Sequence, residues 1–271
     1  MLHIAAPPRS EALAPFIRSF HYHEAAFPPA FERILPTGQA HLMVNLEEDE
    51  FRTYSGPSCE NVHRACGAIL SGPHGKFVTI DTMEQRRLIA VEFKMGGVAA
   101  FLPMPASETC NQVVGLRDVW RRDGSLLREQ LCSARTPANK FSVLEAFLLG
   151  RLVRPCDPVV SAAISLLEGG ASVSGLSSQT GLLPKTLLRR FRAQVGLPPK
   201  RVSRVRRLQR IVASMKHPWG VDWAAVAAEH GYTDQAHLIH DFRDLTGMTP
   251  IAYRPSSPDR RNHVTVGAPP A

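Results

Sequence analysis

The sequence predicts an α+β protein of two domains: a β-rich N-terminal domain with trailing helices, residues 1–153, and an all-α C-terminal domain, residues 157–254. Three observations lead to this prediction. Short apolar stretches broken by Gly and Pro recur at near-even spacing before residue 107, and helical periodicity follows that point. In addition, one nine-residue pattern occurs twice near the C-terminus, and 271 residues is long for a single core.

The N-terminal segments have the pattern of short strands. A Pro-Thr-Gly turn leads into the alternating stretch His41–Leu46, and two further strands surround the Gly-Pro-His-Gly loop at 72–75. Leu88–Phe93 is a strong strand that ends before Gly96 and Gly97. Residues 11–27 suit either a strand or a short helix. Several short strands at even spacing favour a small β-barrel or a sandwich.

Helical patterns follow over 107–120, 125–132 and 140–154. A link at 154–158 contains two prolines and marks the expected domain boundary. Residues 255–271 contain prolines and few apolar side chains, so we expect a disordered tail.

Charge is distributed unevenly along the chain. Residues 1–150 contain 15 Lys and Arg against 16 Asp and Glu, whereas residues 157–254 contain 13 against 7. A basic C-terminal domain beside a neutral one predicts a polyanion as the partner of the C-terminal domain alone. No stretch approaches the roughly 20 apolar residues that span a bilayer. Five scattered cysteines without a CxxC motif indicate reduced thiols, and together these features predict a cytoplasmic protein that does not interact with membranes.

The repeated pattern is Phe-Arg-x-x-x-Gly-x-x-Pro, which begins at Phe191 and again at Phe242, 51 residues later. A glycine precedes each copy, Gly181 and Gly231, and an amphipathic stretch follows it. Helix, glycine turn and second helix form a helix-turn-helix, which is therefore present twice. The basic stretch 200–215 has the pattern of a long helix joining the two units.

Residues 157–254 resemble the DNA-binding domain of AraC/XylS-type bacterial transcription regulators. The resemblance rests on GYTDQAHLIHDFRDLTGMTPIAYR, residues 231–254. PTGQAHLMVNL, VEFKMGG and LEAFLLGRL in the first 153 residues resemble a divergent sensor domain of such regulators. The resemblance implies a sequence-specific DNA-binding regulator, not an enzyme, which places two helices in the major groove about 34 Å, or ~10 base pairs, apart. It also implies double-stranded DNA as partner, with a small-molecule effector, RNA polymerase and a second copy of the chain as further candidate partners.

The resemblance also implies which residues contact DNA. Base-reading positions map to Lys185, Leu188 and Arg189 in the first unit and to Ala236 and His240 in the second. Arg189 is the foremost candidate, because arginine pairs in a bidentate manner with guanine. His240 stands where an Arg is expected, which puts guanine preference there in doubt. The complete predicted DNA-binding set is Lys185, Thr186, Leu188, Arg189, Arg192, Arg204, Gln235, Ala236, His237, His240 and Arg243.

The two copies differ in their helix starts. Leu183 stands where a Ser cap is usual, and loss of a cap costs about 1 kcal/mol. Thr233 is a plausible cap for the second copy, with Asp234 near the positive end of the helix dipole. We therefore expect the first copy to supply more base-specific hydrogen bonds and the second to supply more stability.

Two His/Cys groups are weak candidates for metal. His21 and His23 alternate before Glu24, like part of the metal site of a cupin barrel, and Cys59, His63, Cys66 and His74 have an irregular spacing for zinc. We expect neither to bind metal, and we expect no cofactor or catalytic site. Two alternatives remain open: a cupin-like metal-dependent enzyme domain fused to a DNA-binding module, and an architectural protein that coats DNA without reading sequence.

Overall fold

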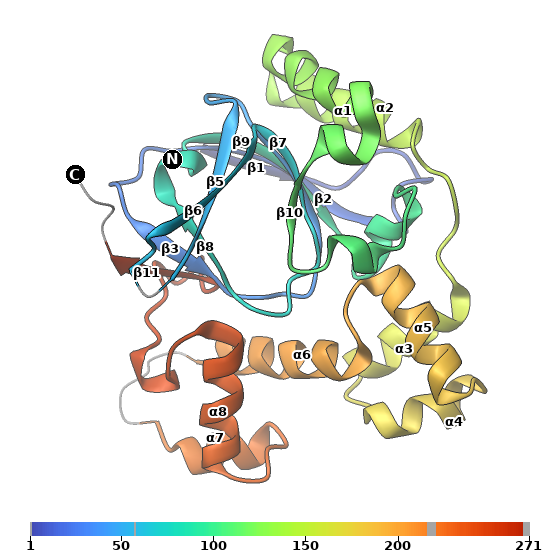
Figure 1. Cartoon of the computed structure of the whole chain (residues 1–271), viewed down its shortest axis with the longest axis vertical. Coiled ribbons are helices and arrows are strands. Elements are labelled where there is room, and N and C mark those ends of the chain that lie inside the picture. The colour runs from blue at the N-terminus through green and yellow to red at the C-terminus, as the bar shows by residue number, and fades with distance from the viewer. Residues whose placement is uncertain (1, 57, 216–220, 268–271) are drawn as a thin grey trace.

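The computed structural model describes residues 2–56, 58–215 and 221–267. Two antiparallel sheets curl around one another into a barrel-like body (Figure 1). The larger sheet has the strand order β1 (Leu2–Ala6), β2 (Ile17–Glu24), β9 (Arg87–Phe93), β4 (His41–Asn45), β7 (Ala68–Ser71) and β10 (Val113–Gly115). The smaller sheet has the order β11 (His263–Gly267), β3 (Phe31–Ile34), β8 (Val78–Asp81), β5 (Glu50–Ser55) and β6 (Asn61–Cys66). The predicted β-rich N-terminal domain is confirmed.

Alternation within the strands decides which face of the larger sheet is buried. Phe20 and Tyr22 of β2 face the same way as Leu42 and Val44 of β4, and all belong to one apolar core. Helices α1 (Leu116–Ser133) and α2 (Pro137–Leu149) cover that face (Figure 1). The sheet and the two trailing helices are thus one packed unit.

The segment before α1 differs from the prediction. Residues 107–120 were expected to be helical, but only a 3-10 turn at Ala106–Thr109 precedes β10. Val113 and Val114 then pair with Ser71 and Leu70 of β7. The open edge of β7 recruits this short β-branched stretch, because unpaired edge groups are satisfied by another strand.

The C-terminal domain is helical, as predicted. Its helices are α3 (Pro158–Glu168), α4 (Leu176–Thr180), α5 (Pro184–Val195), α6 (Pro199–Ser214), α7 (Trp223–Glu229) and α8 (Gln235–Thr246). The pairs α4–α5 and α7–α8 correspond to the two repeats, and α6 runs between them beneath the barrel (Figure 1). Gly181 and Gly231 end the first helix of each pair at φ +69° and +71°. Only a glycine adopts this left-handed conformation without strain, which explains the glycine in each repeat.

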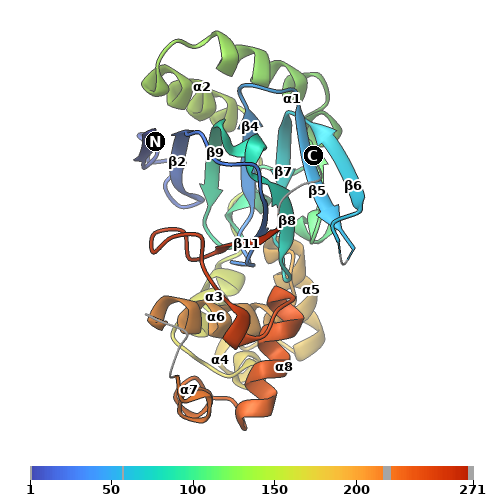
Figure 2. The same cartoon turned by 90° about the vertical axis from the view of Figure 1, so that its left-hand side faces the viewer.

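The predicted disordered tail was wrong for residues 263–267. This segment forms β11, which pairs antiparallel with β3 and lies between the barrel and the helices (Figure 2). Val264 is only 3% exposed and joins the core of the second repeat. The His-Val-Thr-Val-Gly stretch alternates in the manner of a strand, and the free edge of β3 provides its backbone partners.

The two domains share apolar cores. Leu35 of the N-terminal domain packs with α6, α7 and α8, while Met95 packs with α3 and α5. The barrel therefore holds both helix-turn-helix units. Across the described ranges, no helix is long and apolar enough to cross a membrane. All five cysteines are free thiols.

Candidate nucleic-acid interface

Helix α5 presents one apolar and one cationic face. Leu187, Phe191 and Val195 are buried against α3, α4 and α6. Pro184 occupies the first turn, where a missing N–H costs nothing. Leu183 is the N-cap residue, and its side chain makes no capping hydrogen bond, as the sequence predicted.

The solvent face of α5 carries the residues expected to read bases. Lys185, Leu188, Arg189 and Arg192 are exposed at helical spacing, whereas Thr186 is half-buried. None of the three cations forms an ion pair with another residue that the structure describes. The side chain of Leu188 is 42% exposed and belongs to none of the apolar cores of the described residues. An unpaired cationic face around an exposed leucine is suited to a partner that brings phosphates and base edges.

The N-terminal domain borders this face. Pro105 and Ser107 line a shallow pocket of about 400 Å³ together with Lys185, Leu188, Arg189, Arg192 and Ala193. At Gly196, which ends α5, an added Cβ would lie 3.0 Å from the carbonyl oxygen of Ala106. The C-terminal end of α5 is thus in close contact with the barrel, and its N-terminal end points away from it (Figure 1).

Helix α8 has a better start and a less charged face. Asp234, rather than the predicted Thr233, is the N-cap residue, because its Oδ1 accepts the N–H of His237 at 2.7 Å. Aspartate combines the capping oxygen with a charge that favours the helix N-terminus. All five residues predicted to contact DNA from this helix are exposed: Gln235, Ala236, His237, His240 and Arg243. The imidazole of His237 also packs edge-on against the ring of Tyr232 at 5.2 Å.

Arg204 differs from the prediction. Its guanidinium donates to Asp241 Oδ1 and, over 2.7 Å, to Asp244 Oδ2, so it joins α6 to α8. Arg201 donates to the same Asp244 oxygen over 2.8 Å. With its donors committed to two carboxylates, Arg204 holds the second unit together and does not offer a free charge to phosphate. The sequence analysis placed Arg204 on a solvent-exposed polar face. Asp241 lies among the buried positions Leu238, Phe242 and Leu245 of α8, and a buried aspartate indicates that a cation must pair with it.

Burial strengthens this ion-pair network. Asp241 is only 3% exposed, and its Oδ2 accepts the hydroxyl of Tyr232 at 3.3 Å. Burial, and secondarily the Asp241 charge, raise the pKa of Tyr232. Burial alone would raise the pKa of Asp244, but hydrogen bonds from Arg201 and Arg204 outweigh it and hold that pKa below its usual value. Arg207 stacks over the ring of Tyr232 at 4.5 Å, which leaves Lys200 and Arg210 as the exposed cations of α6.

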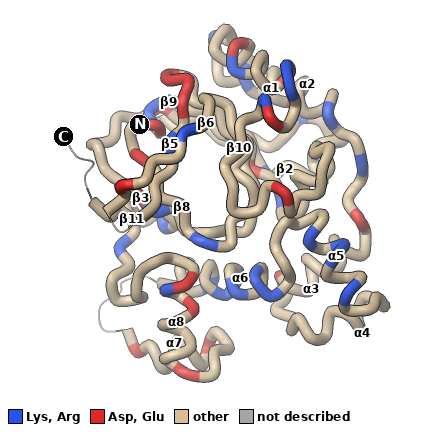
Figure 3. The backbone as a smooth tube through the Cα atoms, in the orientation of Figure 1, with Lys and Arg blue, Asp and Glu red and all other residues tan. Residues whose placement is uncertain are grey.

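The barrel fixes the position of α6 and α8. The N–H of Phe77 donates to the carbonyl oxygen of Leu245 at 2.9 Å, and Arg33 Nη1 donates to that of Gly247 at 2.9 Å. Gln209 of α6 donates to the carbonyl oxygen of Pro36 at 2.8 Å. These bonds and the shared cores set the separation of α5 and α8. Figure 3 shows that basic residues gather along α5 and α6, whereas α7 and α8 also carry acidic ones.

Side chains of the two histidine and cysteine groups contact other residues of the N-terminal domain. His21 Nε2 lies 2.7 Å from Ser19 Oγ and 3.4 Å from Glu92 Oε2, while the ring of His23 stacks on Phe27. Cys66 Sγ donates to the carbonyl oxygen of Ala68, His63 pairs with Ser55, and His74 pairs with Ser71. Over the residues with a described position, no three His, Cys, Asp or Glu side chains converge to hold a metal ion.

Comparisons with known proteins match both parts of the chain. Residues 176–256 match a family described as a helix-turn-helix domain, and residues 5–115 match a domain of unknown function, DUF6597. No curated protein matches. Two crystal structures of ToxT from Vibrio cholerae are similar at 9% identity, with TM-scores of 0.45 and 0.42. They cover 87% and 86% of this chain and 98% and 96% of their own. At such scores no property of ToxT carries over.

Proposed function

We propose that this chain is a DNA-binding transcription regulator of the AraC/XylS type with a divergent N-terminal domain, and that it inserts α5 and α8 into successive major-groove segments. The observation that carries the proposal is the pair of exposed faces at opposite ends of α6. With 16 residues, α6 spans about 24 Å at 1.5 Å per residue, and the flanking helices add to that separation. The result is compatible with one turn of B-DNA, roughly 34 Å.

The two faces are suited to different contacts. Arg189 presents a fork of donors for guanine O6 and N7, with Lys185 beside it for an acceptor or a phosphate. Ala236 offers apolar contact for a thymine methyl group, and Gln235 and His240 offer neutral hydrogen bonding. Arg192 and Arg243, three residues after Arg189 and His240, would contact phosphates that flank the groove.

We propose that the N-terminal domain senses a small molecule and transmits its state to DNA binding. The support is mechanical. Hydrogen bonds from Phe77 and Arg33 to α8, the bond that Pro36 accepts from Gln209, and the shared cores around Leu35 and Met95 couple the barrel to both units. A change in the conformation of the barrel would therefore alter the distance between α5 and α8, while each helix kept its own structure. Dimerisation and contact with RNA polymerase stay predictions.

The deciding experiment is selection of duplexes from a random pool by the full-length protein at fixed salt. We expect two conserved half-sites about 10 base pairs apart. Arg189→Ala should cost about 1–3 kcal/mol on the selected site and relax one base position. Arg190→Ala is the neighbouring comparison, since Arg190 is paired with Asp157 at 2.5 Å and should leave the base preference intact.

Two outcomes would contradict the proposal. Equal affinity for all duplexes would favour the architectural alternative, since specific binding exceeds non-specific binding by about 10³ or more. A single conserved half-site would show that only one helix reads DNA.

A further inference from the structure

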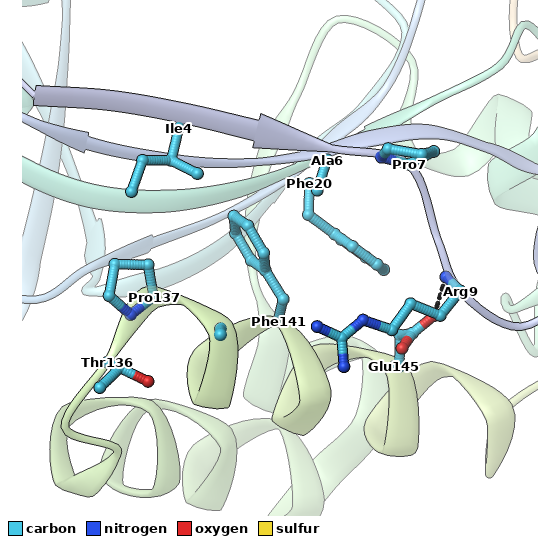
Figure 4. Close-up of a pocket in the computed structure, with 10 residues that line it drawn as sticks. Ile4, Ala6, Pro7, Arg9, Phe20, Thr136, Pro137, Phe141 and Glu145 are labelled. Carbon is cyan, nitrogen blue, oxygen red and sulfur yellow. Dashed lines mark hydrogen bonds between the residues drawn. The ribbon is translucent and has the colours of Figure 1, made fainter.

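A second pocket lies far from the reading helices. It has a volume of about 370 Å³ and sits between β1 and the first turns of α2 (Figure 4). Its apolar walls come from both elements and from the adjoining strand: Ile4, Ala6, Pro7, Phe20, Pro137 and Phe141. The volume is at the lower end of the range for small-molecule sites.

The sequence explains why this space is open. Pro7 and Pro8 have no N–H to donate, so the pairing of β1 with β2 stops at Ala6 and the chain leaves the sheet. Ala6 and Ala138 then face the gap with single methyl groups. The rings of Phe20 and Phe141, stacked with centroids 5.8 Å apart, form the floor.

One end of the pocket is lined by the charged side chains of Arg9 and Glu145. Glu145 Oε1 accepts the backbone N–H groups of Arg9 and Ser10, at 2.5 and 3.0 Å. These bonds hold the chain so that the side chain of Arg9 extends along the pocket toward Phe141 (Figure 4). Within the described part of the chain, the Arg9 guanidinium has no ion-pair or hydrogen-bond partner. Both backbone bonds end on Glu145 Oε1, and no ion pair joins Glu145 to the Arg9 guanidinium among the described residues.

We infer that this pocket binds a small amphipathic molecule with an apolar body and a single anionic headgroup. The apolar body would lie on Phe20 and Phe141, and the headgroup would accept two parallel hydrogen bonds from Arg9. The inference deepens the sensing role proposed for the N-terminal domain, because a ligand here bridges β1 and α2. Helix α2 leads through residues 150–157 directly into α3, the first helix of the DNA-binding domain.

The test is titration calorimetry on the full-length protein without DNA, with octanoate, octylphosphonate, octanol and octylamine as probes. We expect the two anions to bind at one site per chain and octanol to bind at least about tenfold more weakly, because a charge-assisted pair is lost. Octylamine should not bind. The two anions distinguish a carboxylate from a phosphonate headgroup.

Variants locate the site. Arg9→Gln should weaken octanoate about tenfold and leave octanol unchanged. Ala138→Leu should fill the pocket and weaken the binding of every probe. The helix should tolerate this change, because position 138 is exposed and leucine is a good helix former. Arg135→Gln and Asn139→Leu are the matched controls, since both residues are exposed nearby but do not line the pocket.

Equal binding of octanoate and octanol, or full binding by Ala138→Leu, would overturn the inference, as would the absence of binding by any probe. These outcomes can be distinguished from a failure of the proposed DNA-binding function. Duplex selection with the ligand-free protein tests DNA reading alone, whereas calorimetry without DNA tests the pocket alone.

Discussion

Arg204 of α6 and Asp241 of α8 form an ion pair that fastens α8 to the helix that joins the two units. Position 241 is the repeat equivalent of position 190, since the repeats are offset by 51 residues. Arg190 of α5 pairs in turn with Asp157, the N-cap residue of α3, at 2.5 Å. Each unit therefore fastens its second helix, α5 or α8, with an ion pair from the same repeat position, but the charges are reversed.

The first prediction concerns this pair. Arg204→Ala leaves Asp241 buried without its charge partner, and such losses cost about 3–5 kcal/mol. Urea unfolding should show that destabilisation. The slope of log K against log salt for DNA binding should change little, because Arg204 faces carboxylates rather than phosphate. Arg210→Ala, at an exposed position of the same helix, is the control for stability. If Arg204→Ala instead reduced the slope by about 1, Arg204 would contact a phosphate in the wild-type complex, and the prediction would be wrong.

The second prediction concerns the unequal helix starts. Leu183 caps nothing and is 76% exposed, so Leu183→Ser should stabilise the protein by about 1 kcal/mol. Asp234→Ala should destabilise it by a similar amount, because the N–H of His237 loses its acceptor. Midpoints of urea unfolding measure both changes. If Leu183→Ser left the midpoint unchanged, serine would not adopt the capping geometry at this position.

The third prediction concerns the contact of the tail with the barrel. Glu32 accepts hydrogen bonds from Ser256, Arg260 and His263 of the tail and from Gln85 of the barrel. Burial opposes its ionisation, but His263, Arg260 and Gln85 outweigh burial and lower the pKa of Glu32 to about 2.

A depressed carboxylate pKa stabilises the fold above the unfolded value of 4.5, and this contribution is lost as the pH falls toward 2. At neutral pH it amounts to about 3 kcal/mol. Glu32→Gln should therefore lower stability at pH 7 and show less further loss between pH 4.5 and 2 than the wild type. Limited proteolysis within residues 255–262 should also accelerate. Glu11→Gln, at an exposed position, provides the comparison; if the two variants behave alike, Glu32 does not hold the tail.

The fourth prediction concerns buried histidine. Burial, and then the charge of His41, lower the pKa of His74 to about 4. The unfolded chain, with a histidine pKa of 6.5, binds this proton more readily, so stability should fall as the pH drops from 6.5 toward 4. His74→Gln keeps an acceptor for Ser71 and should flatten the stability profile over that interval. Urea unfolding at pH 7, 5.5 and 4.5 measures the difference, and parallel profiles would mean that His74 is accessible to protons in the folded state.

The sequence predicted the buried positions and the helix ends of both repeats. Phe191 and Phe242 are buried, and Gly196 and Gly247 end the reading helices, because each of these positions requires a specific side-chain volume or backbone angle. Helical periodicity also predicted the exposure of Lys185, Arg189 and Arg192, but it placed Leu188, which is exposed, on the apolar face. Their roles toward DNA remain predictions.

By itself, the sequence determined the fold class, the repeat, the missing cap at Leu183 and the positions that face solvent. All of these follow from interactions between residues close along the chain, which local periodicity and backbone preference express. Only the tertiary structure decided that Arg204 pairs with Asp241. It also decided that residues 263–267 pair with β3 at the edge of the smaller sheet, and that Arg9 extends over an apolar pocket. Each of these depends on which distant surfaces meet, and the energy of an ion pair or of a strand edge is fixed by that partner rather than by the residues beside it in sequence.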